Sequence, residues 1–163
     1  MHVDFGTGDG TFVRRTAKLQ SDVLFIGLDA IADNLREASR RAPDNALFGL
    51  LPLEEAPGEL AALADRLTVL FPWGSLLRAV ALPEPGPLSR LRGLCKSGAQ
   101  VRFVFEHASG REALESAWRE AGLDLRGREM SVEEARALPT TWAKRLGYSG
   151  KPRCFRDFQG RAA

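Results

Sequence analysis

The chain has 163 residues, of which 44% are hydrophobic and 27% charged, and a formal net charge of +2. These values are typical of one ordinary soluble domain with a substantial core, so residues 1–163 are expected to form a single domain. No apolar run reaches the 18 or so residues of a membrane span and no secretory signal opens the chain, so we expect a cytoplasmic protein without membrane contact. Two cysteines and two histidines, at no metal-ligand spacing, predict neither a disulfide framework nor a metal site.

Strand and helix signals alternate along the chain. Short apolar runs predict seven strands, over residues 2–5, 23–28, 46–50, 67–71, 101–105, 123–130 and 153–158. Helical spacing and end signals predict helices over residues 12–19, 31–41, 59–65, 76–82, 88–94, 109–120 and 132–138. The Pro-rich stretch 83–87 is expected to be a rigid break and not a domain linker. The alternation predicts an α/β protein, Rossmann-like and doubly wound, with a mostly parallel seven-stranded sheet.

The first ten residues contain a glycine-rich motif. A short apolar run reaches Asp4 and is followed by Gly6, Gly8 and Gly10, and Asp29 ends the second apolar run. Glycines at a strand-to-helix turn let backbone N–H groups approach a ligand, and a carboxylate about 20 residues further on suits a ribose diol. The pattern therefore indicates a nucleoside cofactor, with a purely structural turn as the alternative.

The spacing of this loop argues against a phosphate ligand. It reads G-x-G-x-G and not G-x-G-x-x-G, and no Lys-Ser/Thr pair follows it. Asp4 and Asp9 would repel a pyrophosphate but could accept hydrogen bonds from an ammonium group. S-adenosylmethionine carries an ammonium group and a ribose but no phosphate. The loop resembles motif I of the class I S-adenosylmethionine-dependent methyltransferases, and other nucleotide binders remain the alternative.

Two tryptophans stand where an aromatic face could be accessible. Trp73 lies between Pro72 and Gly74 at the end of the fourth strand, and Trp142 opens a basic C-terminal region. Indole faces stack on nucleobases, contributing about 1–3 kcal/mol per base, so this pair could hold an extruded base. Either side chain could equally belong to the core. Trp118, on the apolar stripe of a helix, is expected in the core.

The C-terminal region is strongly basic. Residues 140–163 hold six Lys or Arg against one Asp, a net charge of +5, whereas the remaining residues sum to −3. Such a concentration predicts either a phosphate-facing surface or a solvated basic tail.

Three segments together resemble one methyltransferase family. Asp-Phe-Gly-Thr-Gly-Asp-Gly at 4–10, Phe-Pro-Trp-Gly-Ser-Leu-Leu-Arg at 71–78 and Thr-Thr-Trp-Ala-Lys-Arg-Leu at 140–146 are similar to motifs of the 16S ribosomal RNA adenine-N1 methyltransferases of the kanamycin–apramycin resistance type. The resemblance implies a class I methyltransferase fold with an antiparallel last strand, and S-adenosyl-L-methionine as cofactor. It further implies methylation of N1 of a flipped adenine, position 1408 in the decoding site of 16S rRNA in the 30S subunit, which confers aminoglycoside resistance.

The resemblance also assigns roles to matching positions. The cofactor-binding positions that it implies are Asp4, Gly6, Thr7, Gly8, Asp29, Ala30, Leu53, Glu54 and Ser75. Trp73 and Trp142 match the pair that stacks on the target adenine, and Thr140 matches a hydroxyl residue facing the cofactor; we group these three as catalytic. The positions that match the RNA-docking linker are Lys144, Arg145, Lys151 and Arg153.

The chain departs from the family pattern in two places. It begins almost at the glycine loop, so we expect a shortened N-terminus and first strand, and the segment around residues 106–116 is shorter than the family's. Reduced stability and activity would follow. Two alternatives therefore stay open: a methyltransferase acting on tRNA or a small molecule, or a non-catalytic remnant that binds cofactor or RNA. A monomer is expected.

Overall fold

The described strands form one mixed sheet. The computed structural model describes residues 1–82, 85–107, 110–145 and 153–163. The strands are β1 (His2–Phe5), β2 (Phe25–Asp29), β3 (Ala46–Leu50), β4 (Ala64–Leu70), β5 (Cys95–Glu106), β6 (Leu123–Met130) and β7 (Phe155–Ala162). Their order is β3-β2-β1-β4-β5-β7-β6, with β7 antiparallel to both β5 and β6. This topology confirms the predicted doubly wound, mostly parallel sheet with an antiparallel last strand.

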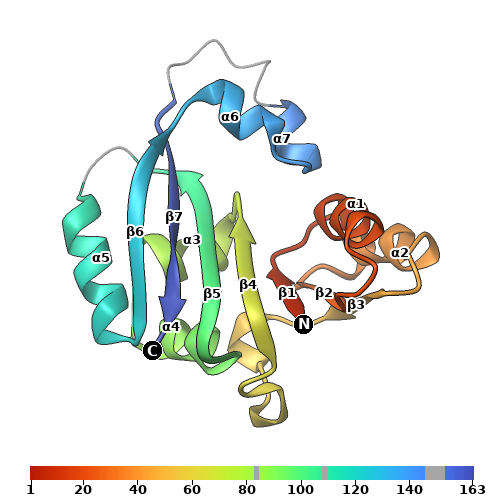
Figure 1. Cartoon of the computed structure of the whole chain (residues 1–163), viewed down its shortest axis with the longest axis horizontal. Helices are drawn as coiled ribbons and strands as arrows, with labels where there is room; N and C mark the ends of the chain where they lie inside the picture. Colours follow the sequence, from red (N-terminus) through yellow and green to blue (C-terminus); the bar gives the residue numbers. More distant parts are fainter. Residues whose placement is uncertain (83–84, 108–109, 146–152) are drawn as a thin grey trace.

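Helices surround the sheet and cross its upper end. They are α1 (Thr11–Leu19), α2 (Ala32–Arg40), α3 (Gly74–Ala81), α4 (Pro85–Gly93), α5 (Arg111–Glu120), α6 (Val132–Ala137) and α7 (Thr141–Arg145), with single 3-10 turns at Leu53–Glu55 and Gly58–Leu60. Figure 1 shows α1 and α2 beside β1–β3, α3 and α4 behind β5 and β7, and α5 beside β6. Helices α6 and α7 lie beyond the ends of β4 and β5 (Figure 1).

The carboxyl ends of β1, β2 and β4 meet at one edge of the sheet. Asp4 of β1 pairs in parallel register with Gly27 of β2 and Thr68 of β4. The glycine loop therefore leaves the sheet next to Asp29, at the end of β2, and next to Phe71, which follows β4. In doubly wound sheets this edge is where ligands bind.

The core lies around Trp118 of α5, as predicted. Its side chain is fully buried, and its indole Nε1 donates a 3.1 Å hydrogen bond to the Val80 carbonyl. Phe103 and Phe158 of the sheet meet the indole ring edge-on. The polar end of this large side chain is thus satisfied inside the core. Within the described residues, no helix is long and apolar enough to cross a membrane.

Several elements differ from the sequence prediction, including α7, where no helix was predicted. Instead of a helix over 59–65, one 3-10 turn at Gly58–Leu60 is followed by β4, because the backbone N–H groups of Leu63 and Ala64 donate to the carbonyl of Leu94. Strand β5 begins at Cys95, so Gly98 lies inside a bulged part of the strand and does not close a helix. The described part of helix α4 starts at Pro85, so residues 85–87 of the expected break are helical.

Candidate cofactor and target-base site

The loop between β1 and α1 contains three left-handed glycines. Gly6, Gly8 and Gly10 have φ angles of 77°, 57° and 68°, a region that residues with a Cβ rarely adopt. A Cβ on Gly6 would lie 2.5 Å from a methyl of Leu76, and one on Gly10 would lie 2.5 Å from the ring of Phe48. A Cβ on Gly8 would meet nothing within 4 Å. Gly6 and Gly10 therefore allow close packing, whereas Gly8 borders open space.

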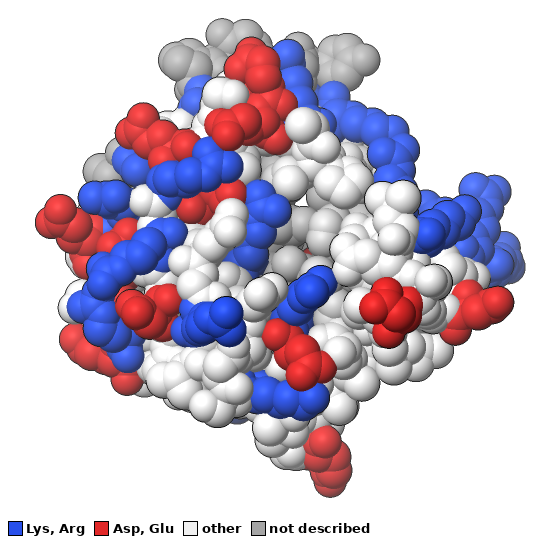
Figure 2. Space-filling view, in the orientation of Figure 1, with Lys and Arg blue, Asp and Glu red and all other residues white. Residues whose placement is uncertain are grey.

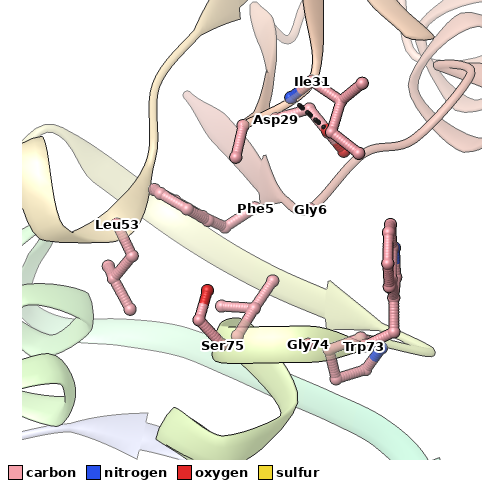
Figure 3. A pocket seen from close by; sticks show the side chains of 11 residues that line it. Phe5, Gly6, Asp29, Ile31, Leu53, Trp73, Gly74 and Ser75 are labelled. Atoms are coloured by element: carbon pink, nitrogen blue, oxygen red, sulfur yellow. Dashed lines mark hydrogen bonds between the residues drawn. The ribbon is translucent and has the colours of Figure 1, made fainter.

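Asp29 ties this loop to the start of α2. The side chain is buried, and its Oδ2 accepts a hydrogen bond from Gly8 N at 2.7 Å while its Oδ1 accepts one from Ile31 N at 2.9 Å. Figure 3 shows the bond to Ile31 at the edge of a pocket. Oδ1 also lies 3.5 Å from Asn34 Nδ2, whereas Oδ2 has a second lone pair that can accept a hydrogen bond from a ligand diol.

The pocket beside Asp29 has a volume of about 190 Å³. It is lined by Phe5, Gly6, Asp29, Ala30, Ile31, Leu53, Pro72, Trp73, Gly74, Ser75 and Leu76. In Figure 3, Phe5, Leu53 and Ser75 surround the space below Asp29. Among these described lining residues Asp29 alone is charged. A mostly apolar pocket with one carboxylate suits a nucleoside, whose base packs and whose ribose hydrogen-bonds, and it lacks the cations that a phosphate attracts.

Asp4 lies at the buried end of β1. Its Oδ1 accepts a 2.6 Å hydrogen bond from Thr68 Oγ1. Burial raises the pKa of Asp4 to about 6, the Thr68 bond opposes this rise, and the nearby Asp29 carboxylate adds to it. A buried carboxylate whose own charge is costly is stabilised by a cationic ligand. Asp4 is therefore suited to face an ammonium or sulfonium group.

A second pocket, of about 240 Å³, joins the glycine loop to α7. It is lined by Asp4, Gly6, Thr7, Gly8, Asp9, Phe12, Asn34, Leu70, Phe71, Trp73, Thr140, Thr141, Trp142 and Arg145. Gly6 and Trp73 line both pockets, so the two spaces adjoin there. The residues present fit S-adenosyl-L-methionine: an apolar nucleoside pocket continues into one with a buried carboxylate, Asp4, an exposed one, Asp9, and an open position at Gly8.

The two tryptophans of the second pocket differ in their surroundings. Trp73 is 69% exposed and Trp142 39% exposed. The Trp142 ring stacks on Phe71, with ring centroids 4.7 Å apart, and the Arg153 guanidinium lies 5.6 Å from the Trp142 ring centroid. Phe71 has a φ of 50°, a strained conformation for a residue with a side chain. This turn after β4 thus holds a platform for Trp142 and projects Trp73 outward.

Helix α7 and its flanks place the remaining predicted residues. Thr140 Oγ1 accepts a 3.0 Å hydrogen bond from Ala143 N, so this hydroxyl caps α7 while it also lines the second pocket. Lys144 and Arg145 are exposed on α7, and Figure 2 shows Lys and Arg side chains gathered over α7, α1 and α2. Arg153 pairs with Glu106 at 3.6 Å.

Most of the predicted cofactor and target-base residues line the two pockets. Those that do are Asp4, Gly6, Thr7, Gly8, Asp29, Ala30, Leu53, Ser75, Trp73, Trp142 and Thr140. Glu54 is exposed and lines neither pocket, and Lys151 lies outside the described residues. Sequence reasoning assigned no role to Asn34, Phe71 or Thr141, although Phe71 and Thr141 belong to the two tryptophan motifs.

The fold and the site define the class of protein. A sheet of order 3-2-1-4-5-7-6 with a nucleoside-sized pocket at its glycine loop is that of a class I S-adenosylmethionine-dependent methyltransferase. The sequence profile of the family described as "NpmA: 16S rRNA (adenine(1408)-N(1))-methyltransferase" matches residues 1–109. The chain belongs to this family, which confirms the resemblance seen in its motifs.

Individual relatives agree with this assignment. The 16S rRNA (adenine(1408)-N(1))-methyltransferase of Escherichia coli is 28% identical over 187 residues, covering 96% of this chain and 84% of the relative. The crystal structure of the aminoglycoside resistance methyltransferase NpmB1 is 33% identical, with a TM-score of 0.78 over 99% of this chain and 86% of the other. A mutant of the Catenulisporales acidiphilia enzyme, crystallised with cosubstrate SAM, is 25% identical with a TM-score of 0.81, covering 99% of this chain and 84% of the other.

Proposed function

We propose that this chain transfers the methyl group of S-adenosyl-L-methionine to N1 of adenine 1408 in 16S rRNA, and thereby confers aminoglycoside resistance. The observation that carries the proposal is the meeting of the two pockets at Gly6 and Trp73. A cofactor seated beside Asp29 would present its reactive end to the space between the two tryptophans. Membership of the adenine-1408 methyltransferase family supports the same acceptor.

The residues of the second pocket suit attack by adenine N1. This nitrogen has an in-plane lone pair and bears no proton in the neutral base, so no general base is required. When bound, S-adenosylmethionine supplies an electrophilic methyl group on its sulfonium centre. Trp73 and Trp142 would hold the extruded base, and Asp4 would fix the cationic end of the cofactor. Catalysis then depends on positioning, which a site without a catalytic His or Cys can provide.

We also infer the setting in which the protein acts. Residues 1–163 form one catalytic domain that works as a monomer on the 30S subunit in the cytoplasm. The single sheet shared by all the described strands supports one domain. The exposed Lys144 and Arg145 beside Trp142 support docking on a phosphate-rich surface.

Methyl transfer to purified 30S subunits tests the proposal. Radiolabelled S-adenosylmethionine should label 16S rRNA, and reverse transcription should stop at adenine 1408, because N1 methylation blocks Watson–Crick pairing. Subunits with guanine at position 1408 are the matched control, since guanine N1 bears a proton and should not be labelled. A stop at another nucleotide, or labelling of tRNA in place of 30S subunits, would overturn the acceptor assignment.

A further inference from the structure

Helix α7, whose described residues are Thr141–Arg145, carries Trp142. Most of the stability of a helix in a protein comes from its packing against the rest of the molecule. The orientation of Trp142 therefore depends on contacts between α7 and the rest of the molecule. Stacking on Phe71 is one such contact, but it restrains only the plane of the Trp142 ring.

Thr141 links α7 to the glycine loop. Its Oγ1 donates a 2.5 Å hydrogen bond to Asp9 Oδ2 and lies 3.1 Å from Thr11 Oγ1. The other oxygen of Asp9, Oδ1, accepts a 3.1 Å hydrogen bond from Thr11 N at the start of α1. Asp9 thus binds the first turn of α1 with one oxygen and α7 with the other. It does so from the loop between Gly8 and Gly10.

The carboxylate of Asp9 is ionised at neutral pH. Burial alone would raise its pKa, but hydrogen bonds from Thr141 and Thr11 and the charge of Arg14 hold the pKa below its ordinary value. A hydroxyl bonded to a carboxylate makes a charge-assisted hydrogen bond, which is shorter and roughly twice as strong as a neutral one. The bond from Thr141 is therefore a charge-assisted link, at the exposed rim of the second pocket, between α7 and the loop.

We propose that Asp9 and Thr141 form a latch through which the cofactor-binding loop positions Trp142 for the target adenine. The inference rests on the proposed function, because Trp142 needs a fixed position only if it receives a base. Gly8, next to Asp9, donates its N–H to Asp29. A cofactor bound to Asp29 would steady the loop and, through Asp9, the helix that carries Trp142. Asp9 and Thr141 are positioning residues in this scheme.

Conservative variants of Thr141 test the latch in methyl transfer. Thr141→Val keeps the shape but loses the hydroxyl, and should lower kcat on 30S subunits about tenfold or more while the cofactor Kd stays within about twofold. Thr141→Ser keeps the hydroxyl and should restore kcat to within about threefold. Thr16→Val is the matched control: Thr16 lies on α1 and donates only within that helix, to the Phe12 carbonyl. Equal kcat in Thr141→Val and Thr16→Val would overturn the proposal.

A double-mutant cycle isolates the bond itself. Asp9→Ala also removes the bond to Thr11 N, but that loss is the same with Thr141 or Val at position 141 and cancels in the cycle. Thr141→Val also loses the contact with Thr11 Oγ1, whichever residue stands at position 9. The kcat of the double variant Asp9→Ala, Thr141→Val should therefore be clearly higher than the product of the two single losses predicts. Fully additive losses would contradict a latch formed by these two side chains.

Fluorescence quenching tests the latch without any methyl transfer. In a Trp73→Phe background the remaining tryptophans are Trp142 and the fully buried Trp118, so acrylamide quenching reports Trp142. S-adenosylmethionine should lower the quenching constant, and Thr141→Val should raise it about twofold and abolish the cofactor effect. Unchanged quenching in Thr141→Val would refute the latch. If Thr141→Val alters the quenching but the wild-type chain methylates no 30S subunit, the latch stands and only the proposed acceptor is refuted.

Discussion

The side chains of His2, Thr68 and Asp4 form a buried hydrogen-bonded chain in which the protons can be assigned. Thr68 Oγ1 donates to Asp4 Oδ1, so it must accept its other bond from His2 Nε2, 3.2 Å away. His2 is therefore the neutral Nε2–H tautomer, and its Nδ1 has no hydrogen-bond partner among the described residues. Burial, together with the charge of Arg66, lowers the pKa of His2 to about 4.

These two titrating groups affect stability in opposite directions over one pH range. The pKa of Asp4 rises from 3.8 to about 6, so its contribution to stability is complete below pH 3.8 and is lost as the pH rises to about 6. The pKa of His2 falls from 6.5 to about 4, so the folded state loses stability as the pH falls from 6.5 to about 4. Each change, of about two pKa units, corresponds to about 3 kcal/mol. In the wild-type chain the two effects nearly cancel.

Replacing Asp4 should reveal the pH dependence of folding stability that His2 causes. Asp4→Asn keeps an oxygen acceptor for Thr68 but cannot ionise. We expect the free energy of unfolding without cofactor to rise by about 3 kcal/mol at pH 7.5 and to change little at pH 4. Cofactor affinity should fall by about tenfold or more, because a charge-assisted bond is lost. Urea unfolding from pH 4 to 7.5 measures both curves, and parallel curves for variant and wild type would contradict a raised pKa of Asp4 in the wild-type fold.

Trp73 should contribute to base binding and little to folding. At 69% exposure its ring packs only partly, so Trp73→Ala should change the melting temperature by a few degrees at most. Loss of stacking, about 1–3 kcal/mol per base, should lower kcat/KM on 30S subunits by about 5- to 150-fold with cofactor Kd unchanged. Leu82→Ala, at the other end of α3 and 67% exposed, is the control. Equal kcat/KM in the two variants would rule out stacking on Trp73.

At the scale of the element, two glycines of the loop between β1 and α1 should have different roles: Gly10 in folding and Gly8 in cofactor binding. Gly10→Ala would force a Cβ to 2.5 Å from Phe48 and 2.7 Å from Ala38, and strain at φ 68° adds to this overpacking. It should cost about 2–5 kcal/mol of stability.

Gly8→Ala meets no neighbour and should cost only about 1–2 kcal/mol. Because Gly8 borders the second pocket, calorimetry should show weaker cofactor binding in Gly8→Ala, and wild-type affinity there would refute the assignment.

The elements that sequence reasoning found and missed differ in their physical signals. The sheet was predictable because its parallel strands are continuous apolar runs, and the glycine loop because each left-handed position demands glycine. Helix α7 was missed because its described residues, Thr141–Arg145, bury only Ala143 and so give no periodic apolar signal. The platform role of Phe71 was missed because a left-handed non-glycine before proline contradicts local preference. Glu54, assigned by resemblance, is exposed, since the 3-10 turn buries Leu53 instead.

Across the whole molecule, exposed basic side chains lie beside the target-base pocket. Figure 2 shows them over α7 and, further to the right, over α1 and α2. The exposed arginines on α2 and at its C-terminal end are paired with acids: Arg36 with Asp33, and both Arg40 and Arg41 with Glu37. Among the described residues, no acidic side chain pairs with Lys144 or Arg145 on α7 in this way. The charges of α7 are therefore the more available for phosphate.

Salt dependence of binding tests this difference between surfaces. A phosphate contact contributes about 0.7–0.9 to the slope of log K against log salt concentration. Lys144→Ala and Arg145→Ala should each weaken 30S binding at low salt and reduce that slope by about one. Cofactor affinity should stay unchanged in Lys144→Ala, because Lys144 lines neither pocket. Arg119→Ala is the control, since Arg119 is 49% exposed on α5 and pairs with Asp124 near β6. If the slope falls equally in Arg119→Ala, Lys144 and Arg145 act only through the net charge of the molecule. A decrease confined to the two α7 variants would place the rRNA backbone against α7, directly beside Trp142.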